Sequence, residues 1–358
     1  MDIMAAVQIT NRTSETASTT PLFTNAVRPQ PLLPRGDRRP DPGPVSASPL
    51  SPKLAQELDQ VKDLMIHSLG QAHELPATQA SRYQIDTGGG LLRARLALIS
   101  GDHFGASADY RIASAAACEL MHNASLVHDD LCDGDILRRG KATVWHHFNR
   151  QVALCAGDLL MCAAFMATTE VASPRHSQQL SRCLARHTRT VITGQSLEVA
   201  PEPATRPSLG SYLKATRAKT APFILLPLEA GALGGDATPG QLSGLTRAAD
   251  AIGLAYQVVD DLDDLAEGNG EFHPYHAWLH HQPPADSSAS GSLVSDHLQS
   301  ATLHRATRHA LAALGRAQQQ LTALSPLLYQ ALKPTIQGLQ QRANHHLEAL
   351  PYVLSIRF

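Results

Sequence analysis

The chain has 358 residues, of which 43% are hydrophobic and 17% are charged, and its formal net charge is −2. This apolar content can fill a large core, and the near-neutral charge predicts that the protein has no nucleic-acid partner. Aromatic residues make up only 4% of the chain, while alanine and leucine are abundant. Such a composition favours packed helices over sheets.

Residues 1–50 differ from the rest of the chain because they are rich in Ser, Thr, Pro and Arg. The stretch PLLPRGDRRPDPGPVSASPLSP contains too many prolines for a helix, so we predict a disordered N-terminal tail. An early aspartate and the lack of a continuous apolar segment argue against a secretory signal. The five cysteines form no CxxC pair, which is typical of reduced thiols. We therefore expect a cytoplasmic protein, with a cleaved organelle-targeting peptide at the N-terminus as the alternative.

From residue 51 onward, apolar residues recur at spacings of three and four, which is typical of amphipathic helices. We predict long helices over these segments: 54–72, 107–131, 152–172, 176–200, 209–235, 242–265, 300–323 and 326–350. The segment 152–172 is apolar on nearly all sides, so we expect it to be a buried central helix. No uninterrupted run of about 18 apolar residues occurs in the chain, and we predict no membrane span.

Residues 267–296 interrupt the helical pattern with Gly, Pro, Ser and His, which predicts a flexible loop or flap. His276 and His280 have the i,i+4 spacing of a metal site, but the prolines that follow limit any helix there. We interpret this segment as a solvated loop. The sequence has no alternating strand pattern of any length, so residues 51–358 are predicted to form one all-α domain, an orthogonal helical bundle.

Two acidic clusters share the pattern DDxxD, the first in LVHDDLCDGDILRRG and the second in YQVVDDLDDL. Their aspartates are Asp129, Asp130, Asp133, Asp260, Asp261 and Asp264. On a helix, three carboxylates in this pattern share one face and repel each other unless a cation neutralises them. Mg²⁺ is the natural candidate, because it binds a few carboxylates together with substrate phosphate oxygens. Two such faces, each at the end of an apolar helix, favour a clamp for a diphosphate over two solvated acidic patches.

These motifs resemble those of the trans-isoprenyl (polyprenyl) diphosphate synthase family. The similarity extends from about residue 80 to residue 265 and is nearly continuous over HNASLVHDDLCDGDILRRGKATVW. Further family marks follow in order: AGD at 156–158, GQSLE at 194–198, the Lys-Thr pair in RAKTAPF, and the glutamine of YQVVDD. The resemblance implies an isoprenoid synthase fold with a central apolar cavity. It also implies a Mg²⁺-dependent prenyltransferase in which three ions hold the diphosphate of an allylic substrate.

The resemblance also implies a role for each matching residue. The aspartates of both clusters are the expected metal ligands, and the catalytic group is Asp129, Asp130, Asp133, Lys219, Thr220 and Gln257. The substrate-binding residues are expected to be Arg93, His122, Arg138, Arg139, Lys219 and Gln257. In the family, the residues at positions 138 and 219 hold the allylic diphosphate, and those at 220 and 257 assist deprotonation and steer the cation. The residues at positions 93, 122 and 139 belong to the site for isopentenyl diphosphate.

The chain departs from the family pattern in two places. In TGGGLLRARL, the family's GGKxxR lysine position is Gly90, and Leu91 follows where the family usually has arginine. The chain also has no lysine between Lys219 and Lys333, whereas the family places lysines soon after the second acidic cluster. The resemblance implies that those lysines hold the allylic diphosphate. Losing a charge-assisted contact typically costs about 1.5–3 kcal/mol, so we expect the ionising machinery to be intact but weakened and the site for isopentenyl diphosphate to be damaged.

Three functions therefore stay open. The first is a synthase that condenses an allylic diphosphate with isopentenyl diphosphate, and Arg93, His122 and Arg139 favour it. The second is a terpene synthase on the same scaffold, which needs no isopentenyl diphosphate, and Gly90 and Leu91 favour it. The third is a non-catalytic subunit of a heteromeric synthase, against which both complete DDxxD motifs argue.

For a condensing enzyme, the small residues Ala124 and Ser125 before the first acidic cluster predict a deep channel and a product of C20 or longer. The family commonly dimerises through its central helices, and the apolar segment 152–168 suits such an interface. We therefore expect a homodimer.

Overall fold

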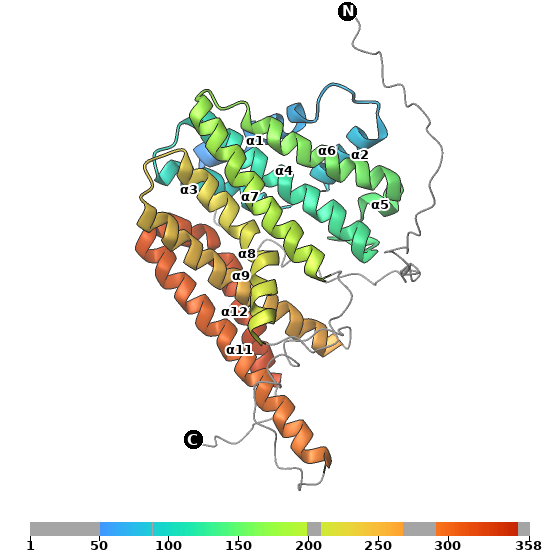
Figure 1. The fold of residues 1–358 in the computed structure, drawn as a ribbon, viewed down its shortest axis with the longest axis vertical. Helices are drawn as coiled ribbons and strands as arrows, with labels where there is room; N and C mark the ends of the chain where they lie inside the picture. The colour runs from blue at the N-terminus through green and yellow to red at the C-terminus, as the bar shows by residue number, and fades with distance from the viewer. Residues whose placement is uncertain (1–50, 88, 199–208, 268–290, 350–358) are drawn as a thin grey trace, which may run out of the picture. The chain divides into compact units, whose positions relative to one another are not determined.

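The computed structural model describes residues 51–87, 89–198, 209–267 and 291–349, which are coloured in Figure 1. Its elements are α1 (Pro52–Ser68), α2 (Pro76–Asp86), α3 (Leu92–His103), α4 (Ala108–Asp133), β1 (Leu137–Arg138), β2 (Lys141–Ala142), α5 (Val144–His147), α6 (Arg150–Thr168), α7 (Pro174–Glu198), α8 (Leu209–Leu233), α9 (Pro239–Glu267), α11 (Gly291–Leu324) and α12 (Pro326–Ala349). Within these ranges the chain is helical apart from one antiparallel hairpin of β1 and β2. The predicted all-α fold is confirmed.

Two hydrophobic cores hold the helices together. The first is built mainly by α1, α4 and α6, around Met65, Tyr110 and Leu160. The second is built mainly by α9, α11 and α12, around Ile252 and Leu314. α8 contributes to both cores, because it is apolar on opposite faces, and it packs against α3, α4, α7 and α9. Together with α3, which also contributes residues to both cores, α8 links the two halves of the bundle.

The common direction of three helices positions the candidate site. Figure 1 shows α4, α7 and α9 running the same way, with their C-terminal ends on one side of the bundle. α4 and α7 both pack against α8, and α8 packs against α9. The acidic clusters lie at the C-terminal ends of α4 and α9, so the bundle places both of them on that side.

The long helices lie close to their predicted positions, but the shorter helices α2, α3 and α5 were not predicted, and α1 ends at Ser68 rather than residue 72. The predicted flap also differs. Residues 291–296 were expected to be loop, but they form the first turns of α11, and Glu267 ends α9. The stretch after Gly291 contains neither glycine nor proline for more than twenty residues, so a helix can begin there. Residues 268–290 and the predicted tail 1–50 lie outside the described residues.

The expected central helix is α6. By length and composition it is apolar enough to cross a bilayer, with 44% of its most apolar window buried inside the protein. Its alanines Ala153, Ala156 and Ala163 are fully or almost fully buried, and the helix packs closely against α4 and α2. Only one face of α6 is therefore buried in the core, because Leu154 and Met166 are more than half exposed. The expectation of a helix buried on nearly all sides is wrong in this respect.

The contact between α3 and α8 depends on glycine. A Cβ atom at Gly231 would collide with the carbonyl oxygen of Ala97 and lie 2.7 Å from the backbone nitrogen of Gly101. Because both obstacles are backbone atoms, the two helices would have to separate. We expect Gly231→Ala to lower the free energy of unfolding by about 1–3 kcal/mol, which is typical of an overpacked core.

Gly315 in α11 provides the matched control, because a Cβ atom there would meet nothing within 4 Å. Gly315→Ala is expected to raise stability by about 0.5–1 kcal/mol, since alanine loses less backbone entropy in a helix. Urea unfolding of both variants measures the difference. Equal effects of the two substitutions would contradict the proposed close approach of α3 and α8.

Candidate active site

The first acidic cluster occupies the last turns of α4. Asp130 and Asp133 lie within the final four residues of the helix, which ends where Gly134 takes a left-handed conformation with φ of 73°. The C-terminal end of a helix carries partial negative charge, so carboxylates are disfavoured there. The cluster therefore requires nearby positive charge.

Arg138 supplies part of that charge. Asp130 is almost completely buried, with 1% of its side chain exposed, and its Oδ1 lies 2.6 Å from Nη2 of Arg138. Nε of Arg138 also donates a hydrogen bond of 2.8 Å to the same oxygen. Burial opposes the charge of Arg138, but its hydrogen bond with Asp130 and the attraction of that carboxylate outweigh the effect, so the pKa of Arg138 is raised.

The hairpin of β1 and β2 fixes where the two arginines point. Arg138 pairs with Lys141 across the hairpin, so Arg139 and Gly140 form its two-residue turn. Both have positive φ, 56° and 73°, as a type I′ turn requires. Asparagine or glycine is usual at the first position, and a left-handed arginine costs about 1–2 kcal/mol. The surrounding contacts must hold Arg139 in place.

A second group of charged and polar side chains lies beside α4, before the acidic cluster. It consists of Glu119 and His122 of α4 together with Arg93 and Arg139. Glu119 is buried and accepts a hydrogen bond of 2.9 Å from the backbone N–H of Ala94. It thereby caps α3, whose first turn has no side-chain cap of its own. Burial raises the pKa of Glu119, while the charges of Arg93 and Arg139 act in the opposite direction. Arg139 fits closely over Gly89, where any Cβ would lie 2.5 Å from its Nη1.

His122 is the buried neutral member of this group. It is 8% exposed, and neither ring nitrogen has a hydrogen-bond partner among the described residues. Burial lowers the pKa of His122, and repulsion from Arg93, Arg139 and Arg138 lowers it further. Buried polar atoms without partners are costly, so the ring is a candidate to meet a polar ligand.

The second acidic cluster lies in the last two turns of α9 and is connected to α8. Thr220 Oγ1 donates a hydrogen bond of 3.2 Å to Gln257 Oε1. Gln257 Nε2 in turn donates one of 2.9 Å to Asp261 Oδ1. The structure therefore brings three of the predicted site residues into one chain of hydrogen bonds. Lys219 lies in α8 and Asp264 in α9, but their side chains are outside the described part of the chain.

Arg342 and His346 of α12 were not predicted from the sequence. Arg342 Nη2 lies 2.6 Å from Asp263 Oδ2 and 3.1 Å from Asp260 Oδ1. His346 Nε2 lies 2.5 Å from Asp263 Oδ1. Asp263 therefore anchors α9 to α12, and the same guanidinium contacts the acidic cluster. The only local signal is the i,i+4 spacing of Arg342 and His346, which does not identify a partner about eighty residues away.

An apolar cavity of about 340 Å³ extends inward from the first acidic cluster between α4, α6, α7 and α8. Asp129 lines it near the end of α4, and Ser125, Ala124 and Met121 follow at helical spacing along the same wall. α8 contributes Phe223. The central apolar cavity expected from the sequence is present, and Ala124 and Ser125 line it as predicted.

The AGD segment of α6 allows α6 to approach α4. A Cβ atom at Gly157 would collide with the ring of His128, and His128 Nε2 lies 3.4 Å from Asp158 Oδ1. His128 lines the cavity next to Asp129. Gly157 and Asp158 therefore position the ring that precedes the first acidic cluster.

Comparison with solved structures places the fold in the isoprenoid synthase class. A decaprenyl diphosphate synthase from Rhodobacter capsulatus superimposes with a TM-score of 0.64 at 23% identity, over 84% of this chain and 98% of that one. The family model for polyprenyl synthetase matches residues 76–273. The chain belongs to the polyprenyl synthetase family.

Two relatives show how far the similarity extends. The (2E,6E)-farnesyl diphosphate synthase of Mycobacterium tuberculosis is 37% identical over 174 residues, which are 49% of this chain and 48% of that protein. A chloroplastic geranylgeranyl pyrophosphate synthase of Catharanthus roseus is 34% identical over 202 residues, covering 54% and 56%. The chain spans about half the length of the curated relatives it matches.

The pairing of Asp263 with Arg342 and His346 predicts a pH-dependent contribution to stability. Burial raises the pKa of Asp263, but hydrogen bonds from His346 and Arg342 outweigh it, so the pKa is lowered overall. A carboxyl group with a lowered pKa stabilises the fold above its unfolded pKa of about 3.9, and this stability disappears as the pH falls through the folded pKa.

We therefore expect Arg342→Gln to lower the free energy of unfolding at pH 7 by about 1.5–3 kcal/mol, the value of a charged hydrogen bond. The difference from the unsubstituted protein should shrink as the pH falls below about 4. Urea unfolding at a series of pH values measures it. A difference that stays constant down to pH 3 would show that Arg342 contributes only packing.

Proposed function

We propose that this chain is a Mg²⁺-dependent isoprenyl diphosphate synthase that condenses an allylic diphosphate with isopentenyl diphosphate. The main support is the position of two DDxxD clusters at the ends of α4 and α9, with an apolar cavity leading inward from the first. The names of the relatives agree with this proposal, since they are farnesyl and geranylgeranyl diphosphate synthases.

The acidic clusters suit Mg²⁺. Their donors are carboxylates, which are hard oxygen ligands. They crowd helix C-termini, where the backbone adds further negative charge, so a bound divalent cation would relieve their mutual repulsion. We propose that Asp129, Asp130, Asp133, Asp260, Asp261 and Asp264 hold the metal, with three ions in the complete site. When bound, the ions neutralise the charge that develops on the departing diphosphate.

The other residues of the site have roles that follow from their contacts. Arg138 and Lys219 are proposed to bind the allylic diphosphate, Arg138 because its guanidinium already lies against Asp130. Gln257 is held between Thr220 and Asp261, and its amide is proposed to steer the developing carbocation. Thr220 fixes the orientation of that amide and is proposed to assist deprotonation.

We propose that Arg93, His122 and Arg139 bind isopentenyl diphosphate. The unpaired ring nitrogens of His122 support this role, and so does the strained backbone that holds Arg139 over Gly89. The weak point is Gly90. A side chain there would meet nothing within 4 Å, so the space for a lysine is present but the charge is missing.

We propose that the cavity protects the reaction intermediate and determines the chain length of the product. Its walls exclude water from an allylic carbocation, which water would otherwise quench. No large aromatic side chain closes it at Ala124 or Ser125, and we propose a product of C20 or longer.

A terpene synthase is the second candidate, and Gly90 is the observation that favours it. Such an enzyme would use the same acidic clusters and cavity without a second diphosphate. A non-catalytic subunit is the third candidate. It does not explain why the chain keeps the six aspartates of the two clusters.

The apolar surface of α6 and α7 supports a homodimer. Leu154 and Met166 on α6 and Ile192 on α7 are large hydrophobic residues that are more than half exposed. We propose that a second copy of the chain covers this surface, and that the protein is cytoplasmic.

Incubation with Mg²⁺ and geranyl, farnesyl or geranylgeranyl diphosphate, with and without isopentenyl diphosphate, tests the proposed reaction. We expect elongated diphosphates only when isopentenyl diphosphate is present. Asp129→Ala should reduce the rate at least about a hundredfold, because a transition-state charge contact worth about 2.7 kcal/mol or more is lost. Asp59→Ala is the control, since Asp59 is 76% exposed and pairs only with Lys62 among the described residues. Hydrocarbons or alcohols formed without isopentenyl diphosphate would refute condensation in favour of a terpene synthase.

Gly90→Lys tests the weakened second site. For a condensing enzyme, we expect the KM for isopentenyl diphosphate to fall about ten- to a hundredfold, the effect of a regained charge-assisted contact. Gly90→Gln is the matched control, because it fills similar space without the charge. If lysine and glutamine give the same KM, position 90 does not face the diphosphate of isopentenyl diphosphate.

A further inference from the structure

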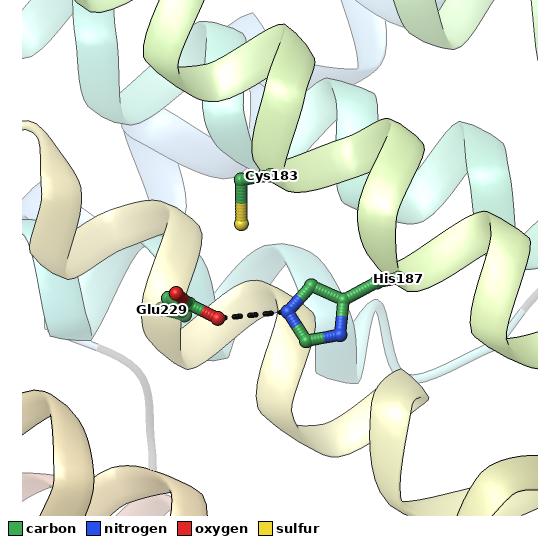
Figure 2. Close-up of side chains that lie close together, drawn as sticks. All are labelled: Cys183, His187 and Glu229. Carbon is green, nitrogen blue, oxygen red and sulfur yellow. Dashed lines mark hydrogen bonds and ion pairs between the residues drawn. The ribbon is translucent and has the colours of Figure 1, made fainter.

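A polar cluster of Cys183, His187 and Glu229 lies beside the apolar cavity, and His187 is its member that lines the cavity. Figure 2 shows Cys183 and His187 of α7 directed toward Glu229 of α8. His187 lines the cavity and is 6% exposed. The cluster is unusual because the remaining cavity lining around it is mainly apolar.

The contacts hold the ring of His187 firmly. His187 Nε2 lies 2.8 Å from Oε2 of Glu229, and Oε1 of Glu229 accepts a hydrogen bond of 2.6 Å from Arg186 Nη2. Burial raises the pKa of Glu229, but the hydrogen bonds from His187 and Arg186 outweigh it, so the pKa is lowered overall. The carboxylate is therefore charged and has partners for both oxygens.

Three ligand types meet here, but the cluster is not suited to a metal ion. The candidate ligand atoms of Cys183, His187 and Glu229 lie within 4.8 Å of one another. However, Arg186 already supplies a cation to the carboxylate, and it also lies 3.7 Å from the sulfur of Cys183. Burial and the charge of Glu229 raise the pKa of the Cys183 thiol to about 12, so the cluster holds a neutral thiol beside the Arg186–Glu229 ion pair.

The helix positions show that His187 lies at the far end of the cavity. Along α4 the lining runs from Cys132, within the acidic cluster, back to Met121, which is eleven residues or about 16 Å of helix. On α8, Glu229 is nine residues past Thr220, which belongs to the second acidic cluster's hydrogen-bond chain. On α7 the lining runs back from Ser196 to His187. All three helices therefore place the polar cluster at the end opposite the aspartates.

We propose that His187, held across the cavity by Glu229, is the end wall that limits the length of the prenyl chain. This inference rests on the proposed condensation. A growing chain fills the cavity from the aspartates inward and stops at the imidazole. To pass it, the chain would have to separate His187 from Glu229 and leave a buried carboxylate oxygen unpaired, which is unfavourable in an apolar site.

Truncation of the ring should therefore lengthen the product. In His187→Ala, the removed volume adds to the end of the cavity, while Arg186 still neutralises Glu229. We expect the main product to gain at least one five-carbon unit relative to the unsubstituted protein, measured by mass spectrometry of the dephosphorylated products. His187→Phe, which fills the same space without polarity, should give products of the original length or shorter.

His176→Ala is the matched control on the same helix. His176 packs against Tyr110 and does not line the cavity, so the product length should not change. If His187→Ala and the unsubstituted protein give products of equal length, the end-wall role of His187 is refuted, while the proposed condensation still stands. Longer products from His187→Phe would lead to the same conclusion. If the unsubstituted protein makes no elongated diphosphate at all, the proposed function fails and this inference fails with it.

Discussion

The crowding of aspartates at two helix C-termini is the constraint on which the rest of the structure depends. Each cluster combines mutual repulsion with the negative end of a helix dipole. The protein compensates from outside each helix, with Arg138 from the hairpin after α4 and Arg342 from α12. Arg138 contacts Asp130 of the first cluster, and Arg342 contacts Asp260 of the second. In the proposed reaction, the clusters also hold cations that arrive with the substrate.

The hairpin and α8 both contain locally unfavourable backbone features close to the candidate site. A left-handed arginine in a two-residue turn is a poor choice for stability alone, yet it lets consecutive residues point to different anions. Arg138 faces Asp130, and Arg139 faces Gly89 and the buried carboxylate of Glu119. Similarly, α8 carries two internal prolines, Pro222 and Pro227. They remove backbone donors at the level of the cavity, and packing on both sides holds the helix there.

The sequence predicts the features that depend on the spacing of residues along a single helix. The periodicity of apolar residues gave most helix positions, and the DDxxD pattern indicated which turns of α4 and α9 carry the carboxylates. The start of α11 was missed because glycine and serine near position 291 are typical of loops, whereas the following residues permit a helix. Contacts between distant helices have no such local signature. The pairs of His187 with Glu229 and of Arg342 with Asp263 join residues 42 and 79 positions apart.

In the proposed reaction, binding of the prenyl chain in the cavity can offset the weaker binding of the two diphosphates. Gly90 and the missing distal lysines remove charge near the diphosphates, so less binding energy is available there. An apolar chain enclosed by α4, α6, α7 and α8 supplies binding energy away from the reacting atoms, at about 25 cal/mol per Å² of apolar surface buried. Such remote binding can orient the allylic diphosphate toward its metal ligands. A rigid end wall strengthens this effect, because it fixes how far the chain enters and therefore where the diphosphate stops. In the proposed reaction, the imidazole at one end of the cavity and the aspartates at the other would act together to position one substrate.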